Sequence, residues 1–368
     1  MKIAVLGIRG FPGVQGGPET HAQNLYPLLV KRGCDVTVFT RSGYVDGSVT
    51  GYEGVKLVCL PCVRNKFLEA FLHTFAGVYA AKKISPDIVH FHAVGPSLFV
   101  PLAKMLGMKA VMTNHGPDYR RKKWNAFARA VLRLGEYAGN GWADGVICVS
   151  RWVTDDINRR FRSDAAFIPN GVRLPSGPPG DSVLKKYGLA RERYVMAIGR
   201  FVPEKGFHDL IEAFGMAGIP GWKLVIVGDA THEDRYTALL KKSASGEVVF
   251  TGVLTGAPLG EIYANAGLFV LPSYYEALPI VLLEAMSHGL SCVVSDIPAN
   301  REVGLPDERY FKPGDVAGIA GMLKNFAARP LAEEEKALQI KTVAGRYDWE
   351  TIADRTLEVY RKVLWRAR

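Results

Sequence analysis

Cysteine is scarce in this sequence, which contains five in 368 residues. A sparse, odd-numbered set does not build the disulfide framework of a small secreted domain and fits a reducing compartment. Cys59 and Cys62 form a C-x-x-C pair, but neither a second ligand pair nor a helix start behind it supports a zinc or redox site. We therefore expect the thiols to be buried or inert.

Long apolar runs are also missing. No segment has the ~18 consecutive uncharged apolar residues that a membrane-spanning helix needs. The apolar run at residues 3–6 is too short for the core of a signal peptide, so we expect a cytoplasmic protein. A hydrophobic content of 48% over this length predicts two α/β domains rather than one.

Acidic residues are in the minority, with 36 Asp and Glu against 46 Lys and Arg, which gives a formal net charge of +10. Such a charge favours an anionic partner: a nucleotide diphosphate, an anionic membrane surface or nucleic acid. Because the sequence has no recognised nucleic-acid motif, we expect no nucleic-acid partner.

Short β-branched runs alternate with longer amphipathic stretches along both halves of the chain, which predicts mostly parallel sheets covered by helices. The expected strands span residues 3–8, 36–40, 55–60, 88–92, 110–113, 145–149, 194–198, 223–227, 247–250, 268–271 and 291–294. A proline- and glycine-rich segment, 174–180, interrupts the pattern and predicts a domain boundary. We therefore expect domains at 1–174 and 181–350. The C-terminal segment 351–368 belongs to a helix expected over 349–365.

A glycine-rich loop, residues 7–17, follows the first expected strand and leads into a helix near Glu19. Glycines there would let backbone N–H groups approach a phosphate at the helix start. The spacing is not G-x-G-x-x-G, and the second strand ends in Thr40-Arg41, where an NAD-binding domain has an acidic residue. Both features argue against an NAD-dependent dehydrogenase, and a plain tight turn stays an alternative for the loop.

Two cationic residues, Arg200 and Lys205, lie five apart on the loop after the first strand of the second half. That loop is expected at the carboxyl edge of the sheet, where α/β proteins bind ligands. An arginine fork and a mobile ammonium group suit a diphosphate whose negative charge grows as it leaves. A solvated basic turn is the alternative.

Three further polar residues follow expected strands. Pro279 marks a helix start, so Glu276 lies in the loop before it and Glu284 lies within an otherwise apolar helix. A carboxylate in that helix needs a hydroxyl or a cation as its partner. His115 follows the strand at 110–113. A lone histidine is more often structural, but its expected position opposite the phosphate loops favours a catalytic role.

Together these residues resemble the retaining glycosyltransferases of family 4, whose GT-B fold has two facing Rossmann-like domains with the active site in the cleft. The resemblance covers nearly the whole chain and rests on an R-x4-K pair, Arg200 and Lys205, combined with an E-x7-E pair, Glu276 and Glu284. It includes the segments Gly16-Gly17-Pro18-Glu19, Thr113-Asn114-His115-Gly116-Pro117-Asp118 and Pro169-Asn170-Gly171-Val172. The segment around His115 is similar to a bacterial subgroup associated with surface-polysaccharide and rhamnose-type transfer.

The resemblance implies a nucleoside-diphosphate sugar as donor. Arg200 and Lys205 would clamp the diphosphate, Glu284 would accept hydrogen bonds from the ribose, and Glu276 would face the sugar hydroxyls. His115 would act as a catalytic residue from the first domain, with Glu19 and Asp118 on the acceptor side. The other implied donor contacts are Gly16, Gly17, Gly252, Val253, Leu254, Leu278 and Ile280. Family members commonly have Phe-Gly where this chain has Leu278-Pro279, and proline offers no N–H to a phosphate.

The resemblance also implies transfer of a hexose or deoxyhexose with retention at the anomeric carbon, by front-side attack, and a C-terminal helix that packs back on the first domain. Two cationic side chains and a helix start can stabilise the leaving diphosphate, and the chain lacks the D-x-D motif of metal-dependent transferases. We therefore expect neither a metal nor another cofactor.

The expected acceptor is a glycan or a lipid-linked sugar, bound by the first domain, in bacterial surface-polysaccharide synthesis. Basic residues at 120–123, 129 and 133, with Trp124, would suit contact with the anionic inner face of the cytoplasmic membrane, and a solvated helix face is the alternative. The rival functions are a nucleotide-sugar epimerase or a phosphorylase on the same architecture, an NAD-dependent dehydrogenase, and a non-catalytic nucleotide-sugar sensor.

Overall fold

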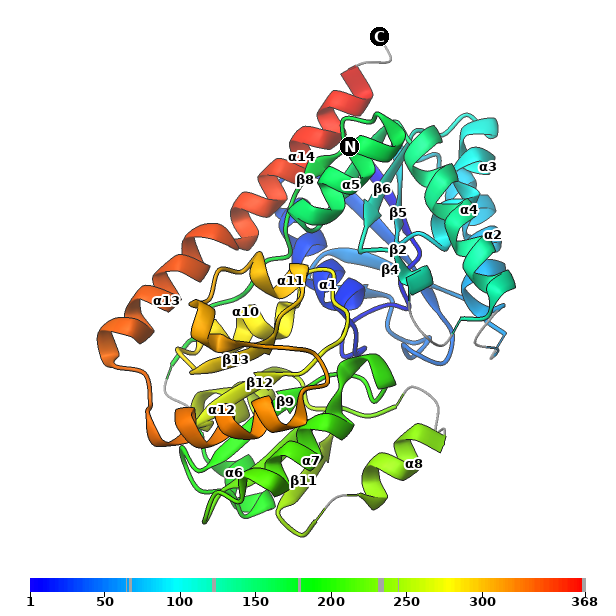
Figure 1. Ribbon diagram of the computed structural model, residues 1–368. Helices are drawn as coiled ribbons and strands as arrows, with labels where there is room; N and C mark the ends of the chain where they lie inside the picture. The colour runs from blue at the N-terminus through cyan, green and yellow to red at the C-terminus, as the bar shows by residue number, and fades with distance from the viewer. Residues whose placement is uncertain are drawn as a thin grey trace. The chain divides into compact units, whose positions relative to one another are not determined.

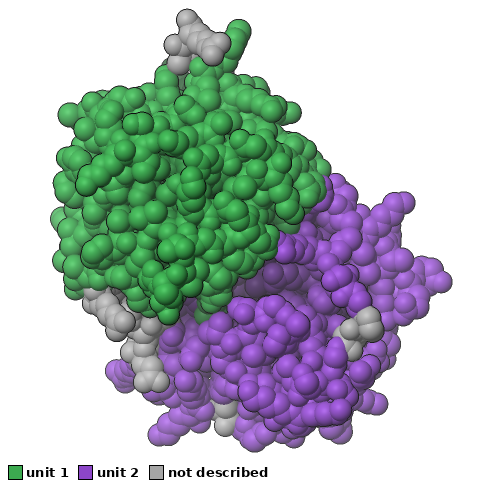
Figure 2. All heavy atoms as spheres, turned by 180° about the vertical axis from the view of Figure 1, so that it is seen from behind, with its two compact units in different colours: residues 1–171, 349–368 green, residues 172–348 purple. Residues whose placement is uncertain are grey.

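The computed structural model describes residues 1–63, 65, 68–120, 124–177, 180–230, 235–243 and 245–365. Contacts divide the chain into two units, coloured separately in Figure 2. Unit 1 comprises Met1–Gly171 and Trp349–Arg368, and unit 2 comprises Val172–Asp348. The sequence placed these boundaries a few residues later, near 174 and 350. Among the described residues, no helix is both long and apolar enough to span a bilayer.

Unit 1 is built on an eight-stranded sheet with the order β3-β4-β2-β1-β5-β6-β7-β8. Neighbouring strands are parallel except for β3 and β4. The strands are β1 (Lys2–Leu6), β2 (Asp35–Arg41), β3 (Gly51–Tyr52), β4 (Val55–Leu60), β5 (Ile88–His92), β6 (Ala110–Asn114), β7 (Gly145–Cys148) and β8 (Ala166–Phe167). The helices are α1 (Gly17–Lys31), α2 (Glu69–Lys83), η1 (Pro96–Phe99), α3 (Val100–Met105), η2 (Asp118–Arg120), α4 (Ala126–Trp142), α5 (Arg151–Phe161) and α14 (Trp349–Trp365).

Helices cover both faces of this sheet (Figure 1). Because successive strand residues point to opposite faces, Ile3 and Val5 of β1 lie in a core with α1 and α14, whereas Ala4 and Leu6 lie in a second core with α2, η1 and α3. The expectation of a parallel sheet buried on both faces is confirmed.

Unit 2 repeats this design with a six-stranded parallel sheet in the order β11-β10-β9-β12-β13-β14. Helices α7 and α12 pack on one face, where they share a core with β9, β10 and β12. The strands are β9 (Tyr194–Ile198), β10 (Lys223–Val227), β11 (Val248–Gly252), β12 (Leu268–Leu271), β13 (Cys292–Ser295) and β14 (Tyr310–Phe311). The helices are α6 (Ser182–Tyr187), η3 (Pro203–Lys205), α7 (Phe207–Ala217), α8 (Arg235–Lys242), α9 (Gly256–Asn265), α10 (Ile280–Ser287), α11 (Pro298–Arg301), η4 (Asp307–Arg309), α12 (Val316–Ala328) and α13 (Glu333–Arg346).

The chain leaves unit 1 and returns to it at adjacent positions. A Cβ on Gly171 would lie 2.5 Å from Cδ2 of Trp349, so the first crossing packs directly on the residue that begins α14. Helix α14 then runs along α1, where Arg32 donates to the Asp354 carboxylate (2.6 Å) and to the Glu350 carbonyl (2.9 Å). The C-terminal helix is thus part of unit 1.

Candidate active site

The site residues of unit 2 lie where parallel strands end. Strands β11, β10, β9 and β12 are neighbours in the sheet, so the loops after them emerge at one edge. The loop after β9 carries Arg200 and Lys205, β11 ends in Gly252, and the loop after β12 carries Glu276. Parallel pairing therefore collects residues that are up to 76 positions apart, from Arg200 to Glu276, at one sheet edge.

Lys205 and Glu276 form an ion pair. The Lys205 Nζ lies 2.5 Å from Oε1 of Glu276, and Ser273 Oγ donates to the same carboxylate oxygen at 2.7 Å. Both side chains are mostly buried, with 18% and 12% exposed. This pairing orients the carboxylate and balances the charge of the ammonium group.

Gly206 locks the two loops together. Its φ is +67°, and a Cβ there would lie 2.2 Å from the Pro272 carbonyl oxygen. Tyr274 adds two links, because its N–H donates to the Glu204 carbonyl (2.9 Å) and its hydroxyl donates to Asp209 (2.8 Å). The sequence motifs did not indicate a role for Ser273 or Tyr274, although these residues lie three and two positions before Glu276.

Glu284 is the fifth residue of α10 and finds the hydroxyl partner that the sequence predicted. Tyr263 Oη donates to Glu284 Oε2 at 2.9 Å. Burial raises the pKa of Glu284 to about 7, and the Tyr263 hydrogen bond opposes the shift. Nearby His288, whose ring stacks on Tyr263, has its pKa lowered to about 4 by burial. Of these two neighbouring side chains, Glu284 is therefore the one whose pKa lies near neutral pH.

The other residues of unit 2 that were predicted to bind the nucleotide-sugar donor differ in how far they are exposed to solvent. Arg200 is half-buried, and Val253 is exposed beyond the end of β11. Gly252 has a φ of +71°, and its carbonyl accepts from Gly228 N–H at 2.8 Å. The Leu278 and Ile280 side chains are buried, so at these positions only backbone groups remain for a ligand, and Pro279 between them has no N–H. Leu254 is half-buried.

In unit 1, the glycine-rich loop is held by a buried ion pair. Arg9 donates to Glu19 Oε1 from its Nε (3.0 Å) and to Oε2 from its Nη2 (3.1 Å), and its backbone N–H donates to Oε1 (3.1 Å). Glu19 is 4% exposed. A Cβ on Gly16, which precedes α1, would lie 2.1 Å from Glu19 Oε2, whereas Gly17 faces open space. Both oxygens of Glu19 thus brace the loop, and a role toward an acceptor stays a prediction.

His115 belongs to a hydrogen-bonded chain of aromatic side chains. Its Nε2 lies 3.0 Å from Nδ1 of His92, and His92 Nε2 contacts the Tyr26 hydroxyl. Tyr26 Oη lies 3.0 Å from Nδ1 of His90, which also lies 2.6 Å from the Tyr360 hydroxyl of α14. The chain ends at Thr113, whose Oγ1 is 2.7 Å from His90 Nε2.

Burial lowers the pKa of His115 and of His90 to about 3, and it lowers the pKa of His92 as well. All three imidazoles are therefore neutral at physiological pH. A neutral imidazole has one donor and one acceptor nitrogen, so the bond to His92 decides which nitrogen of His115 carries the proton. The sequence predicted a role for His115 but none for His92. The alternation in His90-Phe91-His92 does place the His90 and His92 rings on the same face of their strand.

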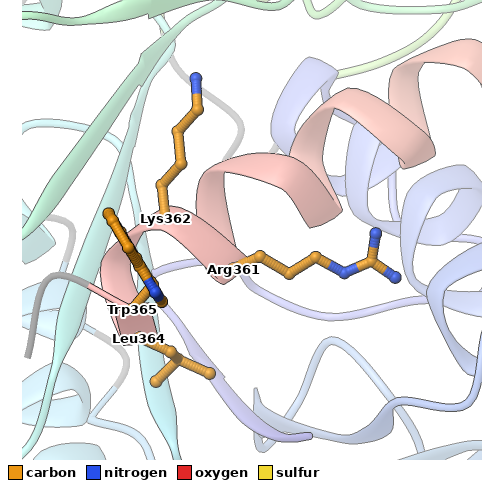
Figure 3. A pocket seen from close by; sticks show the side chains of 4 residues that line it. All are labelled: Arg361, Lys362, Leu364 and Trp365. Carbon is orange, nitrogen blue, oxygen red and sulfur yellow. The ribbon is translucent and has the colours of Figure 1, made fainter. Parts of the chain in front are cut away.

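The other residues predicted for unit 1 are more peripheral. Asp118 is half-buried at the start of η2, and its N–H donates to the Gly116 carbonyl at 2.9 Å. In the basic stretch, residues 121–123 lie outside the described residues, Arg129 is exposed, and Arg133 lies over the Tyr119 ring. A pocket at the end of α14, lined by Arg361, Lys362, Leu364 and Trp365, contains no predicted site residue; Figure 3 shows Arg361 and Lys362 pointing apart.

Comparison with known proteins identifies the family. The family model described as "Glycosyltransferase Family 4" matches residues 15–174, and that described as "Glycosyl transferases group 1" matches residues 183–342. The "Alpha-maltose-1-phosphate synthase" of Mycolicibacterium smegmatis is 29% identical over 99% of this chain and 100% of that protein. The "UDP-Gal:alpha-D-GlcNAc-diphosphoundecaprenol alpha-1,3-galactosyltransferase" of Escherichia coli is 26% identical over 81% of each chain.

Among solved structures, sucrose-phosphate synthase from Thermosynechococcus elongatus has the same fold, with a TM-score of 0.82 and 23% identity over 100% of both chains. This likeness confirms the predicted GT-B fold. The two family models together cover most of the chain, one in each half. The chain therefore belongs to the family-4 glycosyltransferases.

Proposed function

We propose that this glycosyltransferase moves a hexose or deoxyhexose from a nucleoside-diphosphate sugar to a glycan or lipid-linked acceptor, with retention at the anomeric carbon. The observation that carries the proposal is the group formed by Arg200, Lys205 and Glu276 at the carboxyl edge of the unit 2 sheet. Two cations with one oriented carboxylate suit a sugar that leaves behind a diphosphate.

Unit 2 would bind the donor. Arg200 and Lys205 would hold the diphosphate, so that Lys205 exchanges part of its interaction with Glu276 for a phosphate oxygen. Glu276, still held by Ser273, would then accept hydrogen bonds from sugar hydroxyls. Glu284 would accept hydrogen bonds from the ribose, and Gly252, Val253 and Leu254 would line the base.

Unit 1 would supply His115 to the donor sugar or the acceptor. A neutral His115 can both donate and accept, and it avoids placing a positive charge beside an oxocarbenium-like centre. His92 would be a positioning residue, because its Nδ1 is the partner of His115 Nε2. Gly16 and Gly17 would offer backbone N–H groups to the phosphates at the start of α1.

The mechanism we propose needs no metal. Negative charge develops on the leaving phosphate, and the Arg200 guanidinium and the Lys205 ammonium can stabilise it directly. Retention would follow from attack on the face that the diphosphate leaves, with a departing phosphate oxygen taking the proton of the acceptor hydroxyl. Glu276 has its own cation and hydroxyl partners, so we assign it to sugar binding rather than to a covalent intermediate.

The acceptor class rests on similarity. The relative from Escherichia coli is named for transfer to a diphosphoundecaprenol-linked sugar, which is a lipid-linked acceptor. By analogy we propose a role in bacterial surface-polysaccharide synthesis at the cytoplasmic face of the membrane.

A transfer assay tests the proposal. Purified protein in EDTA is incubated with a panel of nucleotide sugars and a panel of glycan and lipid-linked acceptors, and NMR follows the anomeric proton of the transferred sugar. We expect one donor to give a glycoside with the anomeric configuration of the donor. An inverted product, or activity that returns only with added metal, would contradict the mechanism; an epimerised donor without transfer would contradict the function.

A further inference from the structure

The helix α2 of unit 1 is amphipathic in the inverted sense. Its side facing the sheet carries small and polar residues, including Thr74, Gly77 and Ala81, all of which are buried. Its outer side carries Leu68, just before the helix, and Phe71, Leu72, Phe75 and Tyr79, each at least 41% exposed. A surface helix in water normally places its large apolar residues toward the core.

Close packing on the sheet explains the inner face. A Cβ on Gly77 would lie 2.5 Å from Leu6 of β1, so α2 sits too near the sheet for larger side chains. The acidic residue of the helix, Glu69, is buried and pairs with Arg41 at 2.8 Å. On the outer side, the Phe71 and Phe75 rings contact the buried Phe99 of η1, with ring centroids 4.7 and 5.9 Å apart. Both rings nevertheless keep more than 40% of their surface exposed, so packing within unit 1 covers the outer apolar side chains only in part.

The helix α4 continues this surface. It lies on the same side of the sheet as α2 (Figure 1), and η1 contacts both helices, while α3 contacts α4 and η1. Phe127, Leu134 and Tyr137, at helical spacing on α4, are 78%, 57% and 64% exposed. In α3, Met105 is 81% exposed. We call the exposed side chains of α2, α3 and α4 the outer face.

The charge of the outer face has one sign. Over Glu69–Lys83 and Ala126–Trp142 the exposed charged residues are basic: Lys82 and Lys83 end α2, and Arg129 and Arg133 flank the apolar stripe of α4. The two carboxylates of these helices are buried and paired, Glu69 with Arg41 and Glu136 with Arg160 at 2.6 Å. Apolar side chains flanked by cations complement an anionic lipid surface.

We propose that the outer face of α2, α3 and α4 docks unit 1 on an anionic bilayer, with the apolar side chains in the interfacial layer and the basic residues at the lipid headgroups. This inference deepens the proposed function, on which it rests only for the statement that the acceptor is lipid-linked. The docking surface uses a helix, α2, that lies outside the basic stretch at 120–133.

Vesicle co-sedimentation of the full chain tests the docking. We compare neutral phosphatidylcholine vesicles with vesicles that also contain phosphatidylglycerol. The pair Leu72→Ser/Phe127→Ser removes one apolar side chain from each helix, and the pair Arg129→Gln/Arg133→Gln removes two charges. Met216→Ser is a matched control, because Met216 of α7 is also exposed (61%) but lies in unit 2. Lys324→Gln/Lys341→Gln is the matched charge control.

We expect the wild type to sediment with the anionic vesicles and to dissociate at high salt. The apolar pair should weaken partitioning about tenfold, and the arginine pair should weaken it about fivefold for each residue, with both controls unchanged. Absence of wild-type binding, or equal losses in the controls, would overturn the proposal. So would a concentration-dependent dimer that the apolar pair dissociates while vesicles stay unbound, because the face would then join two copies.

Nucleotide binding, read as a shift in thermal unfolding, is measured on the same proteins and separates the two claims. Folded variants that keep the nucleotide shift but lose vesicle binding support the docking surface. Vesicle binding by a protein that no nucleoside diphosphate stabilises would leave the surface in place and overturn the donor assignment.

Discussion

At the scale of single residues, the ion pair between Lys205 and Glu276 orients two groups that we assign to donor binding. The ammonium and carboxylate groups satisfy each other at 2.5 Å while Ser273 holds the carboxylate from the other side. We expect an arriving diphosphate to compete for the ammonium group while Ser273 keeps the carboxylate oriented. In our proposal, the Lys205–Glu276 contact therefore holds both groups in place for a charged leaving group.

Lys205→Ala should lower kcat/KM, with a loss of about 2 to 4 kcal/mol in transition-state stabilisation. The reason is that the charge on the leaving phosphate loses a preorganised partner. Steady-state kinetics with the identified donor measure this loss. Lys336→Ala serves as the control, since Lys336 pairs with the exposed Glu333 within α13. Turnover near the wild-type value in Lys205→Ala would mean that the clamp is misassigned.

Nucleotide affinity should depend on pH through Glu284. The pKa of Glu284 is raised to about 7 before binding, and ribose hydroxyls donate best to the carboxylate. Protonation of Glu284 below that pH thus disfavours binding, and affinity should rise about tenfold between pH 6 and pH 8. Calorimetric titration measures it, with Glu284→Gln as the reference for protonation of the ligand itself. An identical pH profile in the variant would contradict the assignment to ribose.

His92→Phe should reduce kcat about tenfold or more and leave KM for the donor little changed, because it removes the partner that orients His115 without touching substrate. His92→Asn should recover part of the loss, since its amide can replace the hydrogen bond from Nδ1. If both variants keep the wild-type kcat, the histidine chain serves packing alone.

At the scale of elements, the loops after β9 and β12 act as one body because glycine stands at their contact. Gly206→Ala should lower the free energy of unfolding by about 2 kcal/mol, since the new Cβ meets the Pro272 carbonyl oxygen and φ is positive. Gly215→Ala is the matched control: Gly215 is exposed in α7 with open space around it, so this change should add about 0.5 to 1 kcal/mol. Denaturant unfolding compares the two, and a larger loss at position 215 would refute the locking role of Gly206.

Most elements could be predicted from the sequence because their signals are local. The β-branched run at 194–198 is β9, and the helix expected over 349–365 is α14. Pro279 marks the start of α10, so the different settings of Glu276 and Glu284 followed from sequence. The outward orientation of the large apolar side chains of α2 could not be predicted in this way. Hydrophobic periodicity shows that a helix has an apolar side, but it does not show which side packs on the sheet.

At the scale of the whole molecule, the contacts that the sequence could not predict depend on the path of the folded chain. Arg9 and Glu19 are ten residues apart, yet their pairing depends on the path of the glycine-rich loop. The bond between His90 and Tyr360 spans 270 residues and exists because α14 returns to unit 1. Motifs located residues such as Lys205 and Glu276, whereas their supporting partners emerged only from the fold.

Thermal unfolding tests donor binding by unit 2 most directly. Metal-free wild type and Arg200→Ala are unfolded in the presence of UDP, GDP, dTDP, ADP or NAD, with and without EDTA. At one hundred times its dissociation constant, a bound nucleotide adds about 2.7 kcal/mol of stability. We predict that one nucleoside diphosphate stabilises the wild type equally with and without EDTA, and that Arg200→Ala loses the effect. Stabilisation by NAD alone, or by no nucleotide, would contradict it.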